Sequence, residues 1–202
     1  AYNEYANRMA ARIAHMIGQD GKPYEAEADR IHQAMQQRLW LPDRGWYAEY
    51  QDVMGEKLVH PAAALWTIYH SIDSEVPTPF QAWECLRYVD TSIAHIPVRG
   101  PGIPKAENGG DLHLLPESNW MPYMWSLNNV VTGENTHTAL AYWEGGRPDE
   151  AFRIFKGTII DTMYAGMTPG NVPNLQAADP YRGESYTDFG DPLGITSRAL
   201  VE

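Results

Sequence analysis

Two kinds of helix alternate along the central half of the chain. Segments 61–72, 119–131 and 135–143 contain no Asp, Glu, Lys or Arg, whereas segments 79–93 and 148–163 each have charged residues on one face. A helix without a charged face must be buried on every side, while a helix with one apolar face covers a core and meets water. The pattern therefore predicts an inner ring of helices wrapped by an outer ring. An irregular helical bundle is the alternative interpretation.

Further elements are predicted on both sides of this central region. A first helix spans about 2–18, and Pro23 begins a second helix that is followed by an aromatic, turn-rich stretch. Within that stretch, segments 45–50 and 57–59 can pair as a short β-hairpin. A final helix begins at Asp191. The expected fold is all-α, with helical hairpins of the (α/α)6-toroid type, about seven or eight helices of a partial barrel, and one β-hairpin in a loop.

In the predicted ring, loops from inner to outer helices differ in length from loops that return from outer to inner helices. Segments 74–78 and 145–147, which lead from inner to outer helices, are short, whereas segments 96–118 and 166–191, which lead back, are long. Long loops without regular structure are often functional. Because the long loops all leave outer helices, we expect them to gather on one rim of the ring and form its functional face.

Composition restricts the class of protein. With 202 residues, 44% hydrophobic and 20% charged, the chain fits one domain, 1–202, with a sizeable core. A net charge of −11 argues against a nucleic-acid partner. The single cysteine, Cys85, is interpreted as a buried thiol, and neither a membrane span nor a signal peptide is expected. Both ends resemble cut ends, so we expect a fragment of a larger protein.

The predicted rim segments 40–50, 116–125 and 181–191 repeatedly place carboxylates beside aromatic residues. Flat aromatic faces can stack on sugar rings, while polar side chains bind hydroxyl groups. This pattern favours a polyhydroxylated, uncharged ligand such as an oligo- or polysaccharide. The expected substrate-binding residues are Trp46, His60, Glu117, Trp120, Tyr123, Trp125, His137, Arg182 and Tyr186.

Cleavage of a glycosidic bond requires two carboxyl groups, one of which must be protonated to serve as the acid. Glu134 lies between two uncharged helical segments, so partial desolvation should raise its pKa and suit it to be the general acid. Glu184 or Asp188 is the expected base, whereas Asp191 is more consistent with a helix cap. Glu117 can either be catalytic or anchor its loop.

We also considered metal and nucleophilic chemistry. His60, His113 and His137 are candidate ligands, and His137 follows Glu134 by three residues, a spacing that occurs in some metal sites. No HExxH motif and no second such pair occur in the sequence, so we expect no metal and no cofactor. Phosphate-binding loops, dinucleotide fingerprints and a GxSxG motif are also absent.

Four stretches resemble the six-hairpin, (α/α)6-barrel glycoside hydrolases, especially those of polysaccharide-degrading gut bacteria. They are LWLPDRGWYAEYQD, HPAAALWTIYHSID, NWMPYMWSLNNVVTGENTHTALAYWEGGRPDEAFRIFKG and RGESYTDFGDPLGITSRALVE. The resemblance implies a secreted or periplasmic glycosidase with carboxylate catalysts at the barrel rim. A complete barrel has twelve helices, so this chain would be the C-terminal part of a catalytic barrel. Inner helices left exposed by an incomplete barrel would favour self-association.

Two other functions remain open at this point. A sugar isomerase or epimerase on the same barrel would use His60 and His137 as its acid and base. A non-catalytic helical scaffold or glycan-binding module is the third hypothesis, although the sequence shows no repeat of fixed period.

Overall fold

The computed structural model describes residues 1–99, 103–118, 130–161 and 191–201, and within these ranges the protein is mostly helical. The helices are α1 (Tyr2–Met16), α2 (Lys22–Arg38), α3 (Leu65–Asp73), α4 (Pro79–Ser92), α5 (Thr132–Glu144), α6 (Pro148–Ile160) and α7 (Asp191–Val201). The described strands are β1 (Trp40–Leu41), β2 (Trp46–Tyr47), β3 (Tyr50–Gln51), β4 (Val59–His60), β5 (Ile96–Pro97) and β6 (His113–Leu114).

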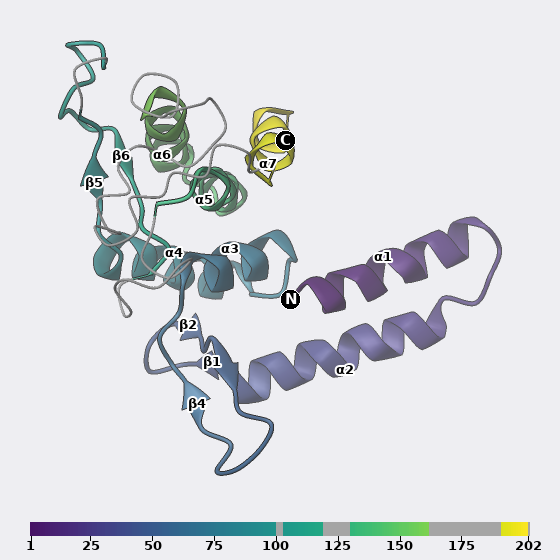
Figure 1. Cartoon of the computed structure of the whole chain (residues 1–202). Helices are drawn as coiled ribbons and strands as arrows, with labels where there is room; N and C mark the ends of the chain where they lie inside the picture. Colours follow the sequence, from purple (N-terminus) through teal and green to yellow (C-terminus); the bar gives the residue numbers. More distant parts are fainter. Residues whose placement is uncertain (100–102, 119–129, 162–190, 202) are drawn as a thin grey trace.

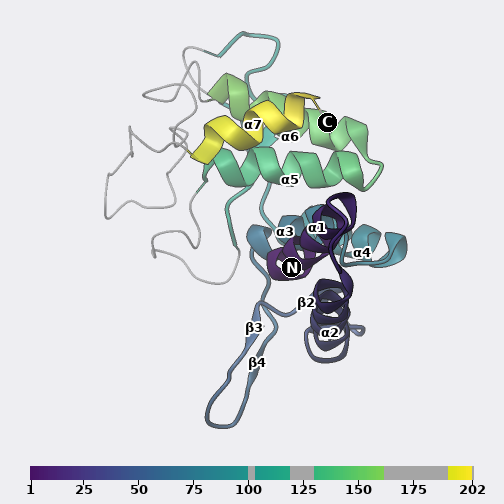
Figure 2. The same ribbon diagram turned by 90° about the vertical axis from the view of Figure 1, so that its right-hand side faces the viewer.

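The helices form consecutive hairpins. Three helices from different hairpins, α3, α5 and α7, pack side by side. Helix α5 contacts both α3 and α7, while α6 lies along α5 on the far side from α3 (Figures 1 and 2). Turn segments 74–78 and 145–147 join α3 to α4 and α5 to α6, so the predicted short inner-to-outer turns are confirmed. The mostly helical class is also confirmed, whereas the described residues do not show a closed toroid.

The uncharged segments are the most deeply buried helices, as the sequence predicted. Six of the nine residues of α3 and nine of the thirteen residues of α5 are buried. In α4 and α6, by contrast, only five residues each are buried, and these lie on one face. Helix α4 begins with the predicted cap, because Thr78 and Gln81 exchange hydrogen bonds between side chain and backbone. The predicted helix 119–131 lies outside the described residues.

Helix α3 begins at Leu65, four residues later than predicted, because segment 61–64 is held in an extended form. The Ala64 N–H donates to the Glu49 carboxylate at 3.1 Å, and the Tyr88 hydroxyl donates to the Ala63 carbonyl at 2.6 Å. These contacts satisfy backbone groups that a longer helix would use internally. Conversely, α5 begins at Thr132, so Glu134 lies in its first turn and not between two helices.

The extended segments form three small antiparallel hairpins among the described residues, where one was predicted. Strand β1 pairs with β2, and β3 pairs with β4 in the register Tyr50–His60 and Gln51–Val59. The predicted pairing of segments 45–50 and 57–59 is confirmed only at Tyr50 and Val59, which lie in β3 and β4, whereas Trp46 and Tyr47 pair with β1 instead. The pair β5–β6 lies in segment 96–118, which was predicted to be irregular.

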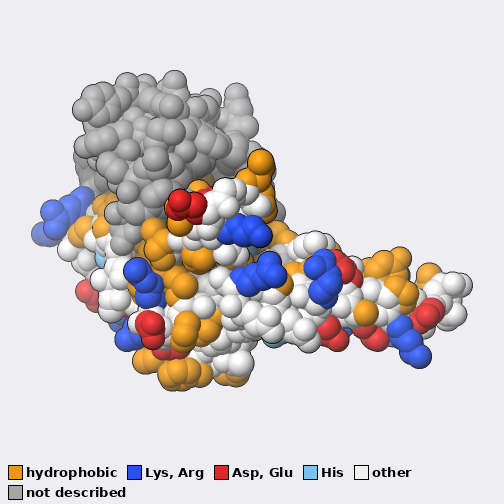
Figure 3. Space-filling view, turned by 90° about the horizontal axis from the view of Figure 1, so that it is seen from below, with side chains coloured by type: hydrophobic (Ala, Val, Ile, Leu, Met, Phe, Trp, Pro, Cys, Tyr) orange, Lys and Arg blue, Asp and Glu red, His pale blue; other side chains and the backbone are white. Residues whose placement is uncertain are grey.

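Helices α1 and α2 form an antiparallel arm that extends to one side of the molecule (Figure 1). The base of this arm is attached through Gln36, whose amide donates to the Tyr47 hydroxyl at 2.8 Å and exchanges hydrogen bonds with Gln81. On the face shown in Figure 3, acidic and basic side chains are interspersed over the described residues. None of the described helices combines the length and apolar character needed to cross a membrane.

Candidate active site

Three glutamates from different segments contact the N-terminal half of α3. Glu49 comes from the loop between β2 and β3, Glu117 from the segment after β6, and Glu134 from the first turn of α5. Glu49 and Glu117 belong to two of the three predicted rim segments, so those two segments do meet at one place. The third rim segment, 181–191, lies almost entirely outside the described residues.

Glu117 is the most deeply buried of these carboxyl groups. The residue is 1% exposed, its carbonyl accepts a hydrogen bond from the Leu65 N–H at 2.7 Å, and Oε2 has no hydrogen-bond partner among the described residues. Burial, reinforced by the nearby charge of Glu134, raises the pKa of Glu117 to about 9. Glu117 is therefore protonated at neutral pH.

Glu134 is half-buried and accepts a hydrogen bond from the hydroxyl of Tyr69, one helical turn into α3. Burial raises the pKa of Tyr69 well above its usual range, and the neighbouring Glu134 raises it further, so Tyr69 remains a neutral donor. The Tyr69 ring also stacks on His137, with ring centroids 4.1 Å apart. Tyr69 thus fixes the position of the Glu134 carboxylate.

Glu49 has a structural role that the sequence did not indicate. Its carboxylate accepts hydrogen bonds from the Ala64 N–H, from Trp66 Nε1 and from the Thr67 hydroxyl. Helix α3 has no side-chain cap of its own, so Glu49 supplies acceptors at the N-terminus, where a negative charge is favourable. Both oxygens of the Glu49 carboxylate therefore accept hydrogen bonds from the N-terminus of α3.

A second polar cluster lies at the opposite end of α3, around Asp73. Asp73 Oδ2 lies 2.9 Å from His137 Nε2 and 2.8 Å from Arg198 Nη1. Burial on its own would raise the pKa of Asp73, but the contacts with His137 and Arg198 outweigh it and hold the pKa well below its usual range. In the same region, burial and the neighbouring His137 lower the pKa of His70 to about 4. These side chains link α3, α5 and α7.

The two histidines that we considered together lie in separate networks. His60 is in β4, where Nε2 lies 3.0 Å from Asp52 Oδ1 and the ring stacks on Tyr50 at 4.1 Å. His137 is held by Asp73 and Tyr69 instead. The described structure shows no contact that joins His60 to His137.

Trp46 packs into the main hydrophobic core. Its Nε1–H donates to the Pro61 carbonyl at 2.7 Å, and its ring lies 4.3 Å from the Tyr88 ring. One face of the Trp46 ring packs on Tyr88 and its N–H group is bound to Pro61, so these contacts support a structural role more than the predicted sugar-stacking role. The other expected site residues lie outside the described ranges: Trp120, Tyr123, Trp125, Arg182, Glu184, Tyr186 and Asp188.

Sequence reasoning missed Tyr69 and Asp73. Tyr69 lies in the segment predicted to be a buried, uncharged helix, and Asp73 follows directly after residue 72, where that helix was predicted to end. A polar side chain on a helix that is buried all round must find a hydrogen-bond partner. The presence of a hydroxyl group at Tyr69 and a carboxylate at Asp73, on or next to a helix predicted to be buried, could therefore have identified both residues.

Comparison of the sequence with protein-family models and with curated proteins gives no significant match.

Proposed function

We propose that this chain forms part of a glycoside hydrolase in which Glu117 and Glu134 supply the acid and base carboxyl groups. The observation that carries the proposal is that Glu117, a buried carboxyl group held protonated at neutral pH, has a second carboxyl group, Glu134, as its neighbour. Burial and the charge of Glu134 raise the pKa of Glu117 to about 9, while Glu134 accepts a hydrogen bond from Tyr69. Pairs of carboxyl groups whose pKa values are pushed apart are typical of glycosidase sites.

In this mechanism Glu117 gives its proton to the glycosidic oxygen as the bond to the anomeric carbon breaks. Glu134 takes a proton from the water that attacks the same carbon, so the products are two sugars with free hydroxyl groups. Tyr69 holds the Glu134 carboxylate in place during this step. These roles differ from the sequence-based hypothesis, in which Glu134 was the acid. Glu184 and Asp188 remain candidates for further acidic groups at the site.

The helix arrangement also favours the proposed fold family. Successive contacts from α3 to α5 to α7, with α6 outside α5, match one arc of an (α/α)6 barrel. We propose that the chain is the later part of such a barrel, acting on an oligo- or polysaccharide in a secreted or periplasmic setting. Trp120, Tyr123, Trp125 and Tyr186 would then stack on sugar rings, and Arg182 would bind hydroxyl groups.

The isomerase hypothesis needs His60 and His137 in one site, and their separate hydrogen-bond networks give it no support. The scaffold and glycan-binding hypothesis likewise has no observation in its favour, whereas a buried carboxyl group with a raised pKa is costly for a purely structural protein.

Release of reducing sugar from a panel of plant and host glycans tests the proposal, using the full-length protein. We expect Glu117→Gln and Glu134→Gln each to lower kcat by about 100-fold or more, since general acid–base groups contribute at least that much. Glu56→Gln, at an exposed position, is the control and should keep full activity. Circular dichroism confirms that each variant is folded. Wild-type turnover in both active-site variants would remove the pair from the mechanism.

A further inference from the structure

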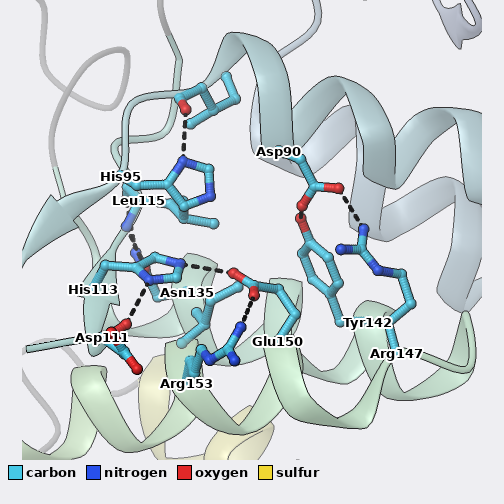
Figure 4. A network of polar contacts seen from close by, with 12 residues as sticks. Asp90, His95, Asp111, His113, Leu115, Asn135, Tyr142, Arg147, Glu150 and Arg153 are labelled. Atoms are coloured by element: carbon cyan, nitrogen blue, oxygen red, sulfur yellow. Dashed lines mark hydrogen bonds and ion pairs between the residues drawn. The ribbon is translucent and has the colours of Figure 1, made fainter.

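A third polar cluster lies away from Glu117, Glu134 and Asp73, on the outer side of the molecule between the β5–β6 hairpin and α6 (Figure 4). It consists of His95, His113 and Glu150. One ligand atom from each residue lies within 4.8 Å of the other two. His113 Nε2 lies 3.0 Å from Glu150 Oε1, and the two imidazole rings are 4.5 Å apart. We propose that these three residues bind one divalent transition-metal ion of the zinc class.

The backbone of the hairpin places both histidines together. Residue Pro97 pairs with His113 in the β5–β6 ladder, so His95, two residues before Pro97, is a diagonal neighbour of His113 on the same face. Gly157 allows α6 to approach this hairpin closely, since an added Cβ there would lie 2.7 Å from the His113 carbonyl oxygen. Glu150, in the first turn of α6, therefore reaches the same point from the other side.

The hydrogen bonds of the two histidines orient both rings as metal ligands are usually oriented. His95 Nδ1 lies 3.1 Å from the Ile93 carbonyl oxygen, and His113 Nδ1 lies 3.1 Å from the Asp111 carbonyl oxygen. A carbonyl only accepts, so both Nδ1 atoms carry the proton and Nε2 of each neutral ring presents a lone pair. Metal-binding histidines typically donate their other N–H in this way.

When the His113 ring is neutral and no metal is bound, its Nε2 lone pair faces Oε1 of Glu150, which is a repulsive contact. Nε2 and Oε1 are both acceptors in that state, and Nε2 has no hydrogen-bond partner with acceptable geometry. A metal ion between them turns the same geometry into an attraction. Ligand atoms of a tetrahedral zinc site lie roughly 3.3 Å apart, as follows from zinc–ligand distances of about 2 Å. The 3.0 Å separation is close to this value, and the ligand atom of His95 lies within 4.8 Å of both.

Charge and burial also suit such a site. The side chains of His113 and Glu150 are 11% and 14% exposed, so the ligands are held by packing. Arg153 Nη1 lies 3.0 Å from Glu150 Oε2 and is the competing cation, but its side chain is 46% exposed and can move into water. Two imidazoles and one carboxylate form the donor set of known zinc sites, with one position left for water. The bound ion would clamp the β5–β6 hairpin, which leads directly to Glu117, against α6.

Zinc titration by calorimetry and cobalt absorption spectroscopy test this site on the full chain. We expect one equivalent of Zn²⁺ to bind, and Co²⁺ to give the visible absorption of a four- or five-coordinate ion. His95→Gln and His113→Gln should each weaken binding by roughly 100-fold or more, since even residues that only support metal ligands can contribute that much. Arg153→Gln removes the competing cation and should tighten binding severalfold.

The control is His15→Gln, because His15 forms a similar histidine–glutamate pair with Glu25 at 2.9 Å but on an exposed surface. It should leave zinc affinity unchanged. The proposal is overturned if wild type binds no stoichiometric zinc, if His95→Gln binds as tightly as wild type, or if the control loses as much affinity. Should His113→Gln fail to fold, His95→Gln and Arg153→Gln still decide the question, because His95 is half-buried and Arg153 is exposed.

Discussion

Arg198 on α7 forms a two-pronged ion pair with Asp73 at the C-terminal end of α3. Nη1 lies 2.8 Å from Oδ2, and Nη2 lies 2.5 Å from Oδ1. The same carboxylate contacts His137 of α5 at 2.9 Å. One side chain, 4% exposed, therefore joins the three helices that pack side by side. Its removal should loosen the inner layer at the end away from the candidate active site.

Replacement of Asp73 by Asn should lower the free energy of unfolding by about 2–3 kcal/mol near neutral pH. The loss of a buried pair costs more than that, but Arg198 is one-third exposed and water screens part of the interaction. Urea unfolding monitored by circular dichroism measures the change. The low pKa of the Asp73 carboxyl adds a pH signature. The stabilisation by the Asp73 carboxylate is present above about pH 4 and is lost as the pH falls further. The stability of Asp73→Asn should therefore fall less than that of wild type in acid.

Glu56→Gln removes an exposed carboxylate at the tip of the β3–β4 hairpin and serves as the control. Its unfolding free energy should lie within about 0.5 kcal/mol of wild type. An Asp73→Asn protein as stable as this control would show that the three-helix contact does not hold the inner layer together.

The raised pKa of Glu117 should make the protein less stable as the pH rises. Below the ordinary glutamate pKa of 4.5 the carboxyl group is protonated in both the folded and the unfolded states. Between 4.5 and about 9 the unfolded chain releases the proton while the folded protein keeps it, so this group favours unfolding increasingly with pH. Glu117→Gln should remove a slope of about 1.4 kcal/mol per pH unit and stabilise the protein at neutral pH. Urea unfolding across that pH range measures both effects.

Glu134→Gln provides the matched test of the coupling between the two carboxyl groups. Without the charge of Glu134, the pKa of Glu117 falls, and the pH-dependent loss of stability should end at a lower pH than in wild type. An unchanged profile in this variant would mean that the two groups do not interact.

The sequence predicted the helices whose burial depends on their own composition, and it failed where a contact came from a distant segment. Helices α3 and α5 were recognisable because the predicted segments 61–72 and 135–143, which cover most of them, contain no charged residue. The start of α3 was wrong because Glu49, fifteen residues before Ala64, caps it from another loop. No local pattern could reveal that contact, since it depends on how the β2–β3 loop packs against the helix.

The candidate site was predictable only in its residue types. The sequence identified Glu117 as a functional candidate because it lies beside aromatic residues in a predicted rim segment, and Glu134 because it lies between two uncharged helical segments. It assigned the raised pKa to Glu134, whereas the structure shows that complete burial raises the pKa of Glu117 and that Glu134 accepts a hydrogen bond from Tyr69. Such differences arise from the packing of α3, α5 and segment 103–118, and hydrophobic periodicity does not encode them.

Replacement of Trp46 by Phe separates its structural role from the sugar-binding role that the sequence suggested. The variant loses the hydrogen bond to the Pro61 carbonyl and part of the contact with Tyr88, so stability should fall by about 1–2 kcal/mol. KM for any glycan substrate should stay unchanged. Trp83→Phe, on the exposed face of α4, is the control and should change stability by less than about 0.5 kcal/mol. A raised KM with unaltered stability would restore Trp46 to the sugar-binding surface.

Two glycine replacements test the close packing of α6 against the β5–β6 hairpin, and they should act in opposite directions. A Cβ at Gly157 would lie 2.7 Å from the carbonyl oxygen and 3.2 Å from the amide nitrogen of His113, so Gly157→Ala must displace strand backbone. We expect it to cost about 1–3 kcal/mol. Gly194, within α7, has no atom within 4 Å of an added Cβ, and Gly194→Ala should stabilise the protein by about 0.5–1 kcal/mol through helix propensity. Thermal and urea unfolding of both variants measure the difference. If Gly157→Ala were as stabilising as Gly194→Ala, His113 could not lie against α6, and the contact that brings it to Glu150 would be lost with it.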